Sequence, residues 1–253
     1  MKTSIALFLI VVLCACRAAA LPKLDEAELR ELGKRYPFFL MIPSTEKKPL
    51  RYVYADAPQH LHVLAVKGGK SSPEWETASL GSAITALELV EDRAGETVLL
   101  VATLGGRILV YDLDDYRLRY EHFQDRFNNI TCLTAANLDA DPQTEVVFIS
   151  DGYLYVYDGD TRVLEWKSIR PHSATEILIA NVDDDPQLEI ILNSGFIIDS
   201  RFREIDVESR NRKNFGRRIR LVDLNGDGYP EILGEANGFP LTIFDIRRRE
   251  EIW

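Results

Sequence analysis

Residues 130–166 read ITCLTAANLDADPQTEVVFISDGYLYVYDGDTRVLEW, and this stretch decides the fold. It contains four short runs of β-branched, aromatic and other apolar residues, separated by Asn, Asp, Pro and Gly, which favour turns. The runs predict strands at 130–136, 145–150, 153–158 and 163–166, each about as long as the strands of an antiparallel meander. The unit closes on Trp166, which stands eight positions after Asp158.

The same ending recurs along the chain. An apolar residue and its follower, usually Asp, precede a closing residue that stands eight positions after the follower. The copies are Tyr111-Asp112 with Tyr120, Tyr157-Asp158 with Trp166, Phe244-Asp245 with Trp253 and, more weakly, Val66-Lys67 with Trp75 and Ile198-Asp199 with Val207. The closing residues are 45, 46, 41 and 46 positions apart. A period of this length is typical of four-stranded propeller blades.

The period predicts an all-β fold, a β-propeller of about five four-stranded blades. We place the blades at 38–77, 81–122, 127–168, 172–209 and 215–253. Radial repetition buries both faces of each sheet between its neighbours. A repeat sets the unit but not the closing angle, so a β-sandwich and an open solenoid of the same strands stay open as alternatives.

The N-terminal residues differ from the repeats. Lys2, an apolar run at 5–13 and small residues up to Ala20 indicate a signal peptide over residues 1–20, so we expect the rest to be exported. The stretch ending at Cys16, LCAC, resembles a bacterial lipobox and predicts lipidation of Cys16 at the cell envelope or periplasm. Cleavage after Ala20 would instead release a secreted protein. Residues 21–37 predict a short amphipathic helix as a spacer.

Composition indicates a globular protein and excludes some partners. The chain has 253 residues, of which 46% are hydrophobic and 28% charged, which suits a packed domain. Its formal net charge is −10. Nucleic acid and anionic membranes would repel a surface of the same sign, so we expect no nucleic-acid partner, and membrane contact only through the lipid anchor.

Three consecutive units carry an acidic loop between their first and second predicted strands. The loops read NLDADPQTE at 137–145, NVDDDPQLE at 181–189 and DLNGDGYPE at 223–231. Ca²⁺ takes six to eight oxygen ligands, and clustered carboxylates repel one another without a cation. We therefore predict structural Ca²⁺, with a backbone carbonyl and water completing each shell. The predicted ligands are Asp223, Asn225, Asp227, Tyr229 and Glu231 in the last loop, Asn181, Asp183, Asp185 and Glu189 in the middle one, and Asn137, Asp139, Asp141 and Glu145 in the first.

The three loops are not equivalent in sequence. Gly228 can adopt the positive φ of a sharp turn, whereas Pro142 and Pro186 cannot, so we expect the last loop to bind most tightly. An EF-hand is excluded because the twelfth position from Asp223 is Gly234 and because strands flank the loop. The alternative to calcium is a set of plain turns in which Asn and Asp bond their own backbone amides.

These loops, each followed by a hydrophobic strand, resemble the FG-GAP calcium repeats of integrin α-chain propellers and of many bacterial exported proteins. The spacing of Asp158, Thr161 and Trp166 is similar to the tryptophan-docking repeat of quinoprotein-type propellers, although Arg162 stands where that motif has Gly. Together the resemblances cover about residues 80 to 253. They imply a propeller with calcium in structural loops, but no particular ligand, because one fold hosts many functions.

Two other groups of residues are candidate sites. His60 and His62 alternate on one predicted strand face, but the sequence places no third ligand beside them, and we interpret them as a solvated strand pair. The basic stretch 210–220 can bind an anionic polysaccharide or an acidic partner, and its alternative is a solvated loop. Its candidate ligand-binding residues are Arg212, Lys213, Arg217 and Arg218.

We favour the hypothesis of a non-catalytic binding, adhesion or scaffold module for a protein or glycan, with calcium rigidifying its loops. The chain has no hydrolase-type serine motif and only four histidines, so nucleophilic catalysis has no visible candidate. The competing hypothesis is a carbohydrate-active enzyme of the polysaccharide lyase or glycoside hydrolase type, or a lectin, because propellers place polar residues around a central pocket.

Overall fold

The structure is a computed structural model. It describes residues 38–45, 48–68, 70–92, 94–122, 126–139, 141, 143–201, 203–209, 214–235 and 241–253. The predicted signal peptide with Cys16, the predicted helical spacer at 21–37, and Arg212 and Lys213 lie outside these residues. The chain divides into two compact units, Met1–Ala78 and Ser79–Trp253.

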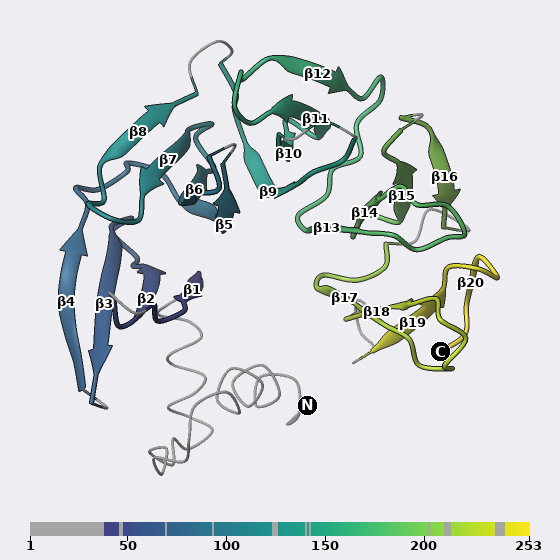
Figure 1. The fold of residues 1–253 in the computed structure, drawn as a ribbon. Coiled ribbons are helices and arrows are strands. Elements are labelled where there is room, and N and C mark those ends of the chain that lie inside the picture. Colours follow the sequence, from purple (N-terminus) through teal and green to yellow (C-terminus); the bar gives the residue numbers. More distant parts are fainter. Residues whose placement is uncertain are drawn as a thin grey trace. The chain divides into compact units, whose positions relative to one another are not determined.

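The first unit contains one four-stranded antiparallel sheet whose strands lie side by side in chain order (Figure 1). Burial alternates along its second and third strands: Val53, Leu61 and Val63 are fully buried, and their neighbours are partly exposed. This period of two is what a strand with one packed face requires. The strands are β1 (Phe39–Ile42), β2 (Leu50–Ala55), β3 (Leu61–Lys67) and β4 (Lys70–Glu76).

The second unit contains four such sheets, each again an antiparallel meander in chain order. The strands of the first two are β5 (Ile84–Glu91), β6 (Thr97–Thr103), β7 (Ile108–Asp112), β8 (Leu118–Glu121), β9 (Ile130–Ala136), β10 (Glu145–Ser150), β11 (Tyr153–Asp158) and β12 (Leu164–Lys167). Those of the last two are β13 (Ile177–Ala180), β14 (Glu189–Leu192), β15 (Phe196–Asp199), β16 (Ile205–Glu208), β17 (Ile219–Val222), β18 (Glu231–Gly234), β19 (Thr242–Asp245) and β20 (Glu250–Glu251).

The predicted all-β architecture of five four-stranded units is confirmed. The described part of the chain contains no helix, and so none long and apolar enough to cross a membrane. The strands predicted at 130–136, 145–150 and 153–158 coincide with β9, β10 and β11, and β12 begins one residue later than predicted.

The closing residues of the sequence repeat occupy one position in the sheets. A β-bulge interrupts the pairing of the third and fourth strands in each of the first four sheets. The residue just after the bulge on the fourth strand is the closing residue, and Trp253 lies beyond the end of β20. The pairs are Trp75 with Val63, Tyr120 with Val110, Trp166 with Val156 and Val207 with Ile197.

The aspartate of the repeat explains why the spacing to the closing residue recurs along the chain. Asp158 ends β11, and its Oδ1 accepts the backbone N–H groups of Asp160 at 2.8 Å and of Thr161 at 2.7 Å. The carboxylate thus takes up donors that the turn into β12 leaves without a strand partner. Asp112 and Asp245 hold the following turn in the same way, through Asp114 at 2.6 Å and Arg248 at 2.8 Å.

Apolar side chains fill the space between successive sheets of the second unit. In β10, Phe148 packs toward the sheet β5–β8, whereas Val147 and Ile149 pack toward the sheet β13–β16. A third cluster joins the sheet β13–β16 to the sheet β17–β20 through residues such as Ile197 and Phe244. A strand buried on both faces explains why β10 is apolar from Val146 to Ile149 and β14 from Ile190 to Leu192.

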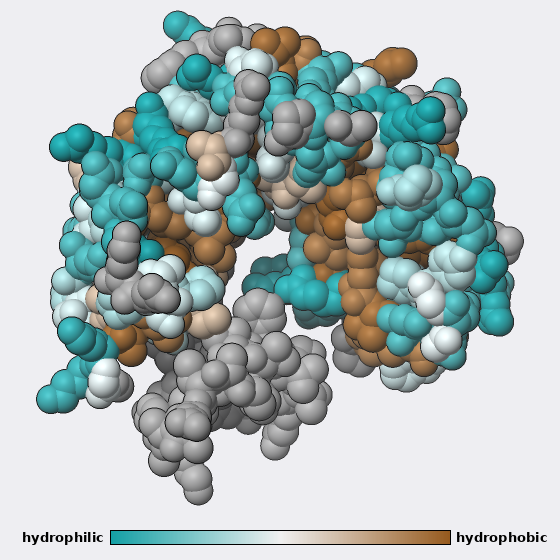
Figure 2. Space-filling model, in the orientation of Figure 1, coloured by the Kyte–Doolittle hydropathy of each residue, from teal (hydrophilic) through white to brown (hydrophobic). Residues whose placement is uncertain are grey.

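Burial falls from the inner strands to the fourth strand of each sheet. β6, β10 and β14 are almost wholly buried, whereas β4, β8, β12 and β20 are mostly exposed. Figure 2 shows the same division, with hydrophilic residues on the outer strands and hydrophobic residues on the sheet faces. The polar fourth strand also protects the open edge of each sheet against pairing with other chains.

Candidate metal centres in the acidic loops

The three acidic loops lie at the same place in three sheets of the second unit. They join β9 to β10, β13 to β14 and β17 to β18. The ninth loop residue is in each case a glutamate that begins the second strand: Glu145, Glu189 and Glu231. Their exposed fractions are only 0%, 1% and 2%. Carboxylates this deeply buried need hydrogen-bond partners or a cation.

One set of hydrogen bonds is common to all three loops. The backbone N–H of the fifth residue donates to Oδ1 of the third at 2.8 Å, and that of the seventh donates to Oδ1 of the fifth at 2.7, 2.8 and 2.9 Å. The second residue donates its backbone N–H to Oε2 of the glutamate, from Leu138 to Glu145, from Val182 to Glu189 at 2.8 Å and from Leu224 to Glu231 at 2.8 Å. The plain-turn alternative is therefore part of the structure, and it leaves other carboxylate oxygens available.

The loops 137–145 and 181–189 bring three carboxylates together. In each, one oxygen from the third, fifth and ninth residues lies within 4.8 Å of the other two. Oε1 of Glu145 and Oε1 of Glu189 are buried and accept no hydrogen bond. Each loop thus combines three acidic groups with one buried oxygen that has no donor, which is the arrangement a cation would satisfy.

Burial and neighbouring carboxylates raise the pKa of both glutamates. Burial is the largest cause that raises the pKa of Glu145 from 4.5 to about 7, with Asp139 and Asp141 adding to it and the Leu138 N–H opposing it. Glu189 behaves alike: burial first, then the charges of Asp183 and Asp185, raise its pKa to about 7. Both pKa values apply to loops without a bound cation. The positive charge of a bound cation would lower the pKa of both glutamates.

The loop 223–231 has a different arrangement. Asn225 donates its amide to Oε1 of Glu231 at 2.9 Å and to Asp227 at 3.2 Å. Asp223 accepts the backbone N–H groups of Gly226 at 2.7 Å and Gly228 at 3.0 Å. Both glycines have positive φ, 75° and 90°, as the sequence predicts for Gly228. An amide at the third position here replaces the aspartate of the other loops, and this loop does not gather its three carboxylates.

The remaining predicted ligands help to close the loops. Asn137 donates its amide to the backbone carbonyl of Asp141 at 2.6 Å, and Asn181 makes the same bond to Asp185. The Tyr229 hydroxyl donates to Asp184 of the neighbouring loop, and the guanidinium of Arg247 lies 4.3 Å from the centre of its ring. Tyr229 therefore connects the last two sheets through its side chain.

In the sheet β5–β8, an arginine side chain on the fourth strand reaches the loop that corresponds to the acidic loops. The motifs in the sequence did not single out this arginine. Arg119, on β8, lies 2.6 Å from Asp92, 2.6 Å from Glu96 and 2.8 Å from Asp112. Its hydrogen bonds to Asp112 and Glu96 raise its pKa above the usual arginine value. One guanidinium thus bridges three carboxylates at this end of the sheet and offsets part of their negative charge.

No arginine occupies that position in the next two sheets. The residue in the bulge of the fourth strand is Arg119 in β8, Glu165 in β12 and Asp206 in β16. Glu165 adds negative charge beside Glu145, although Glu165 is itself paired with Arg203 at 3.3 Å. The 46-residue period aligns Arg119 with Glu165, so this signal was present in the sequence.

The described part of the basic stretch forms no closed site. The side chains of Arg217 and Arg218 are exposed, and their backbones bond to Glu235 at 2.7 Å and 3.1 Å. Arg220 lies 2.8 Å from Glu176. Arg217 and Arg218 are thus available to solvent, as either interpretation of this stretch requires.

The donor set of the two gathered loops fits one class of ion. It consists of carboxylate, amide and backbone oxygens without nitrogen or sulfur, which suits a hard cation such as Ca²⁺. Oε1 of Glu145 and Oε1 of Glu189 accept no hydrogen bond, so these two oxygens are available to such an ion.

Comparisons with known proteins support the fold. No protein-family model and no curated protein matches the sequence. Solved structures do match: a crystal structure of BBS1N in complex with ARL6DN, soaked with lead, has a TM-score of 0.60 at 14% identity and covers 86% of this chain and 67% of that chain. The same complex soaked with mercury has a TM-score of 0.58 at 14% identity, with the same coverage.

A third match is Sqt1 of Saccharomyces cerevisiae, with a TM-score of 0.58 at 11% identity, covering 81% of this chain and 57% of that chain. These neighbours are propeller-type proteins, and five four-stranded antiparallel sheets agree with that architecture. Identities this low establish the fold alone. The chain is therefore an all-β protein with a propeller-type fold.

Proposed function

We propose that the chain is a non-catalytic binding or scaffold module whose sheets are stabilised by Ca²⁺ in the loops 137–145 and 181–189. The observation that carries the proposal is that Glu145 and Glu189 each gather with two further carboxylates and each keep a buried Oε1 that accepts no hydrogen bond. The loops join the first two strands of their sheets, so an ion there would stiffen one end of each sheet.

The sheet β5–β8 supports this assignment by contrast. There Arg119 bridges the carboxylates beside the corresponding loop and offsets part of their charge, whereas the bulge residues of the next two sheets are acidic. A bound divalent cation would supply in those sheets what Arg119 supplies in its own. The sequence predicts the tightest binding in the loop 223–231, but there Asn225 already donates to Oε1 of Glu231, so we propose the reverse order, with Ca²⁺ bound more weakly in this loop than in the other two.

The finer parts of the proposal rest on sequence. Loops of the FG-GAP type would hold the ions, residues 1–20 would direct export, and Cys16 would carry a lipid anchor or be removed with the signal. The partner would be a protein, as in the complex of BBS1N with ARL6DN, whose crystal structure shares the fold. Mass spectrometry of the mature chain distinguishes lipidation at Cys16 from cleavage after Ala20.

Isothermal titration of the purified, chelator-treated chain with CaCl₂ tests the metal sites. We expect the wild-type chain to bind two calcium ions tightly. The double variant Asp139→Asn with Asp183→Asn should lose both of these sites. Asp92→Asn is the matched control, because Asp92 pairs with Arg119 and should not contribute to calcium binding. Calcium binding that is absent, or unchanged in the double variant, would refute the assignment.

A second experiment tests the binding role. Affinity capture from an envelope extract, with and without CaCl₂, should recover a protein partner that the calcium-deficient double variant retains less well. A polysaccharide-degradation screen and a glycan array run on the same protein address the competing hypotheses. Turnover of a polysaccharide without a stoichiometric protein partner would favour the enzyme, and glycan binding without turnover would favour a lectin.

A further inference from the structure

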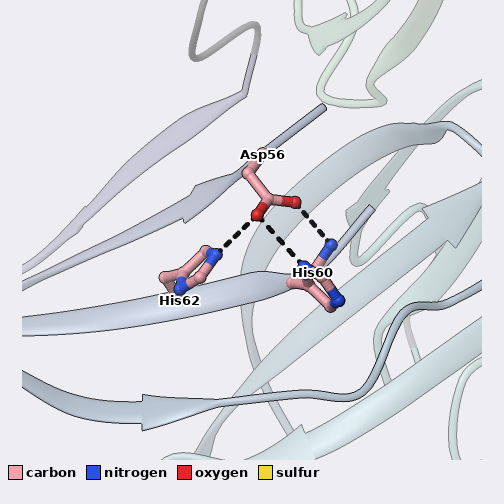
Figure 3. A group of neighbouring side chains, drawn as sticks. All are labelled: Asp56, His60 and His62. Atoms are coloured by element: carbon pink, nitrogen blue, oxygen red, sulfur yellow. Dashed lines mark hydrogen bonds and ion pairs between the residues drawn. The ribbon is translucent and has the colours of Figure 1, made fainter. Parts of the chain in front are cut away.

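The first unit holds a cluster of metal-ligating side chains that is separate from the acidic loops. Asp56 follows β2, His60 precedes β3, and His62 is the second residue of β3 (Figure 3). The turn between them folds back on itself: the backbone N–H of Asp56 donates to the carbonyl of His60 at 3.1 Å. Oδ1 of Asp56 accepts the backbone N–H of His60 at 2.7 Å, which fixes the direction of the carboxylate.

The turn supplies the third group that the sequence did not reveal. Oδ2 of Asp56 lies 3.1 Å from Nδ1 of His60 and 2.9 Å from Nε2 of His62. Figure 3 shows both rings directed at this one oxygen. The side chains of Asp56, His60 and His62 are 23%, 28% and 18% exposed, so the two histidines are partly solvated, but they share one carboxylate and His60 lies before the strand.

A second layer of contacts orients His62. Its Nδ1 lies 3.4 Å from Oε2 of Glu76 on β4, and its ring stacks on Tyr54, with 4.8 Å between ring centres and 12° between planes. A proton on Nδ1 directed at Glu76 leaves Nε2 as the ligating nitrogen. A carboxylate behind a histidine ring is the usual outer partner of a metal-bound imidazole.

The distances from Asp56 Oδ2 to the two ring nitrogens are close to those of a small tetrahedral ion, and all three ligand atoms lie within 4.8 Å of one another. Bonds of about 2.0–2.2 Å to zinc place neighbouring ligand atoms about 3.3–3.6 Å apart. The distances of 2.9 Å and 3.1 Å in this cluster need to lengthen by only a few tenths of an ångström. Two imidazoles and a carboxylate form a mixed nitrogen and oxygen set, which favours Zn²⁺ over Ca²⁺.

We propose that Asp56 Oδ2, His60 Nδ1 and His62 Nε2 form a binding site for a divalent transition-metal ion of the zinc class, with water as the fourth ligand. Glu76 is a positioning residue that sets the tautomer of His62. The site joins the end of β2 to the start of β3, so the ion would lock this hairpin. It lies in the first unit and does not depend on the calcium sites of the second.

Titration of the purified full chain with ZnCl₂, in the presence of CaCl₂, tests the proposal. We expect one zinc ion per chain, and replacement by Co²⁺ should give the intense visible absorption of a tetrahedral site. Asp56→Asn and His62→Gln should abolish both signals, while the control His122→Gln, which alters a histidine of the second unit, keeps them. The calcium variant Asp139→Asn with Asp183→Asn should also bind zinc normally.

The variant Glu76→Gln distinguishes loss of zinc binding at the site from loss of binding through misfolding. Its side chain is 58% exposed, so the sheet should fold, and zinc affinity should fall about tenfold. Circular dichroism checks that each variant keeps its strand content. The proposal is overturned if the wild-type chain binds no zinc, or if the variants Asp56→Asn and His62→Gln fold normally and bind zinc like the wild type.

Discussion

Arg119 and Glu165 occupy the same bulge position in neighbouring sheets and carry opposite charges. Each stands between two residues of its fourth strand that pair with consecutive residues of the third strand, at 118 and 120 in β8 and at 164 and 166 in β12. Arg119 gathers Asp92, Glu96 and Asp112, whereas Glu165 adds a charge of the same sign as its neighbours. One structural position thus holds a built-in cation in one sheet and extra negative charge in the next.

The first prediction concerns Arg119. Arg119→Ala leaves three carboxylates facing one another, and we expect the free energy of unfolding in urea to fall by about 1–2 kcal/mol at low salt. The loss should shrink at high salt, which screens the repulsion. Arg117→Ala is the control: that side chain is 85% exposed and pairs with Asp115, which is 50% exposed, so its removal should cost less than about 0.5 kcal/mol. Equal losses in both variants would contradict the role of Arg119.

A pH dependence is expected from Glu88 on β5. Burial raises the pKa of Glu88 from 4.5 to about 7. Because the folded pKa is the higher one, the folded chain holds a proton that the unfolded chain has lost, and this contribution to stability decreases as the pH rises from about 4.5 through about 7.

Glu88→Gln cannot ionise and should flatten that part of the pH profile. Relative to the wild type, the variant should gain about 1–2 kcal/mol between pH 5 and pH 8 in denaturant unfolding. Glu145 and Glu189 titrate in the same range in both proteins, so the difference between the two profiles isolates Glu88. Parallel profiles would show that Glu88 is not buried as described.

Phe148 should be the most sensitive aromatic residue of the core. It is fully buried, stacks on Tyr155 with ring centres 5.3 Å apart and meets Phe127 edge-on at 4.8 Å. Phe148→Ala should cost about 3–5 kcal/mol in thermal or urea unfolding. Leu164→Ala, on the outer strand and 44% exposed, should cost less than about 1 kcal/mol. A small effect of Phe148→Ala would argue against close packing between the sheets β5–β8 and β9–β12.

Gly234 tests a close backbone approach in the last sheet. A Cβ at this position would collide with the backbone carbonyl oxygen of Phe215, which cannot move as a flexible side chain can. We expect Gly234→Ala to cost about 3 kcal/mol in urea unfolding. Gly226→Ala, whose Cβ would meet open space at a φ of 75°, should cost only about 1 kcal/mol. If both variants lost the same stability, the collision would not be real.

Much of the secondary structure was accessible from local patterns. Apolar alternation and turn residues predicted β9, β10 and β11 with their observed bounds, because strand and turn preferences act over a few neighbouring residues. In the structure, the repeated aspartate lies at the turn between the third and fourth strands, and the closing residue follows the bulge between them. The calcium assignment and the export of the chain remain predictions.

Local sequence patterns were enough to predict how many strands form, where they turn and that the unit recurs at 41 to 46 positions. Which charges meet could be learned from the folded chain alone. The tertiary structure brought Asp56 to both histidines, buried Glu145 and Glu189 beneath their loops, and set Arg119 against one acidic cluster but not the next. The physical reason is that periodicity follows from local backbone preferences, whereas the contacts between side chains depend on turn geometry, strand register and packing, which no single stretch of sequence specifies.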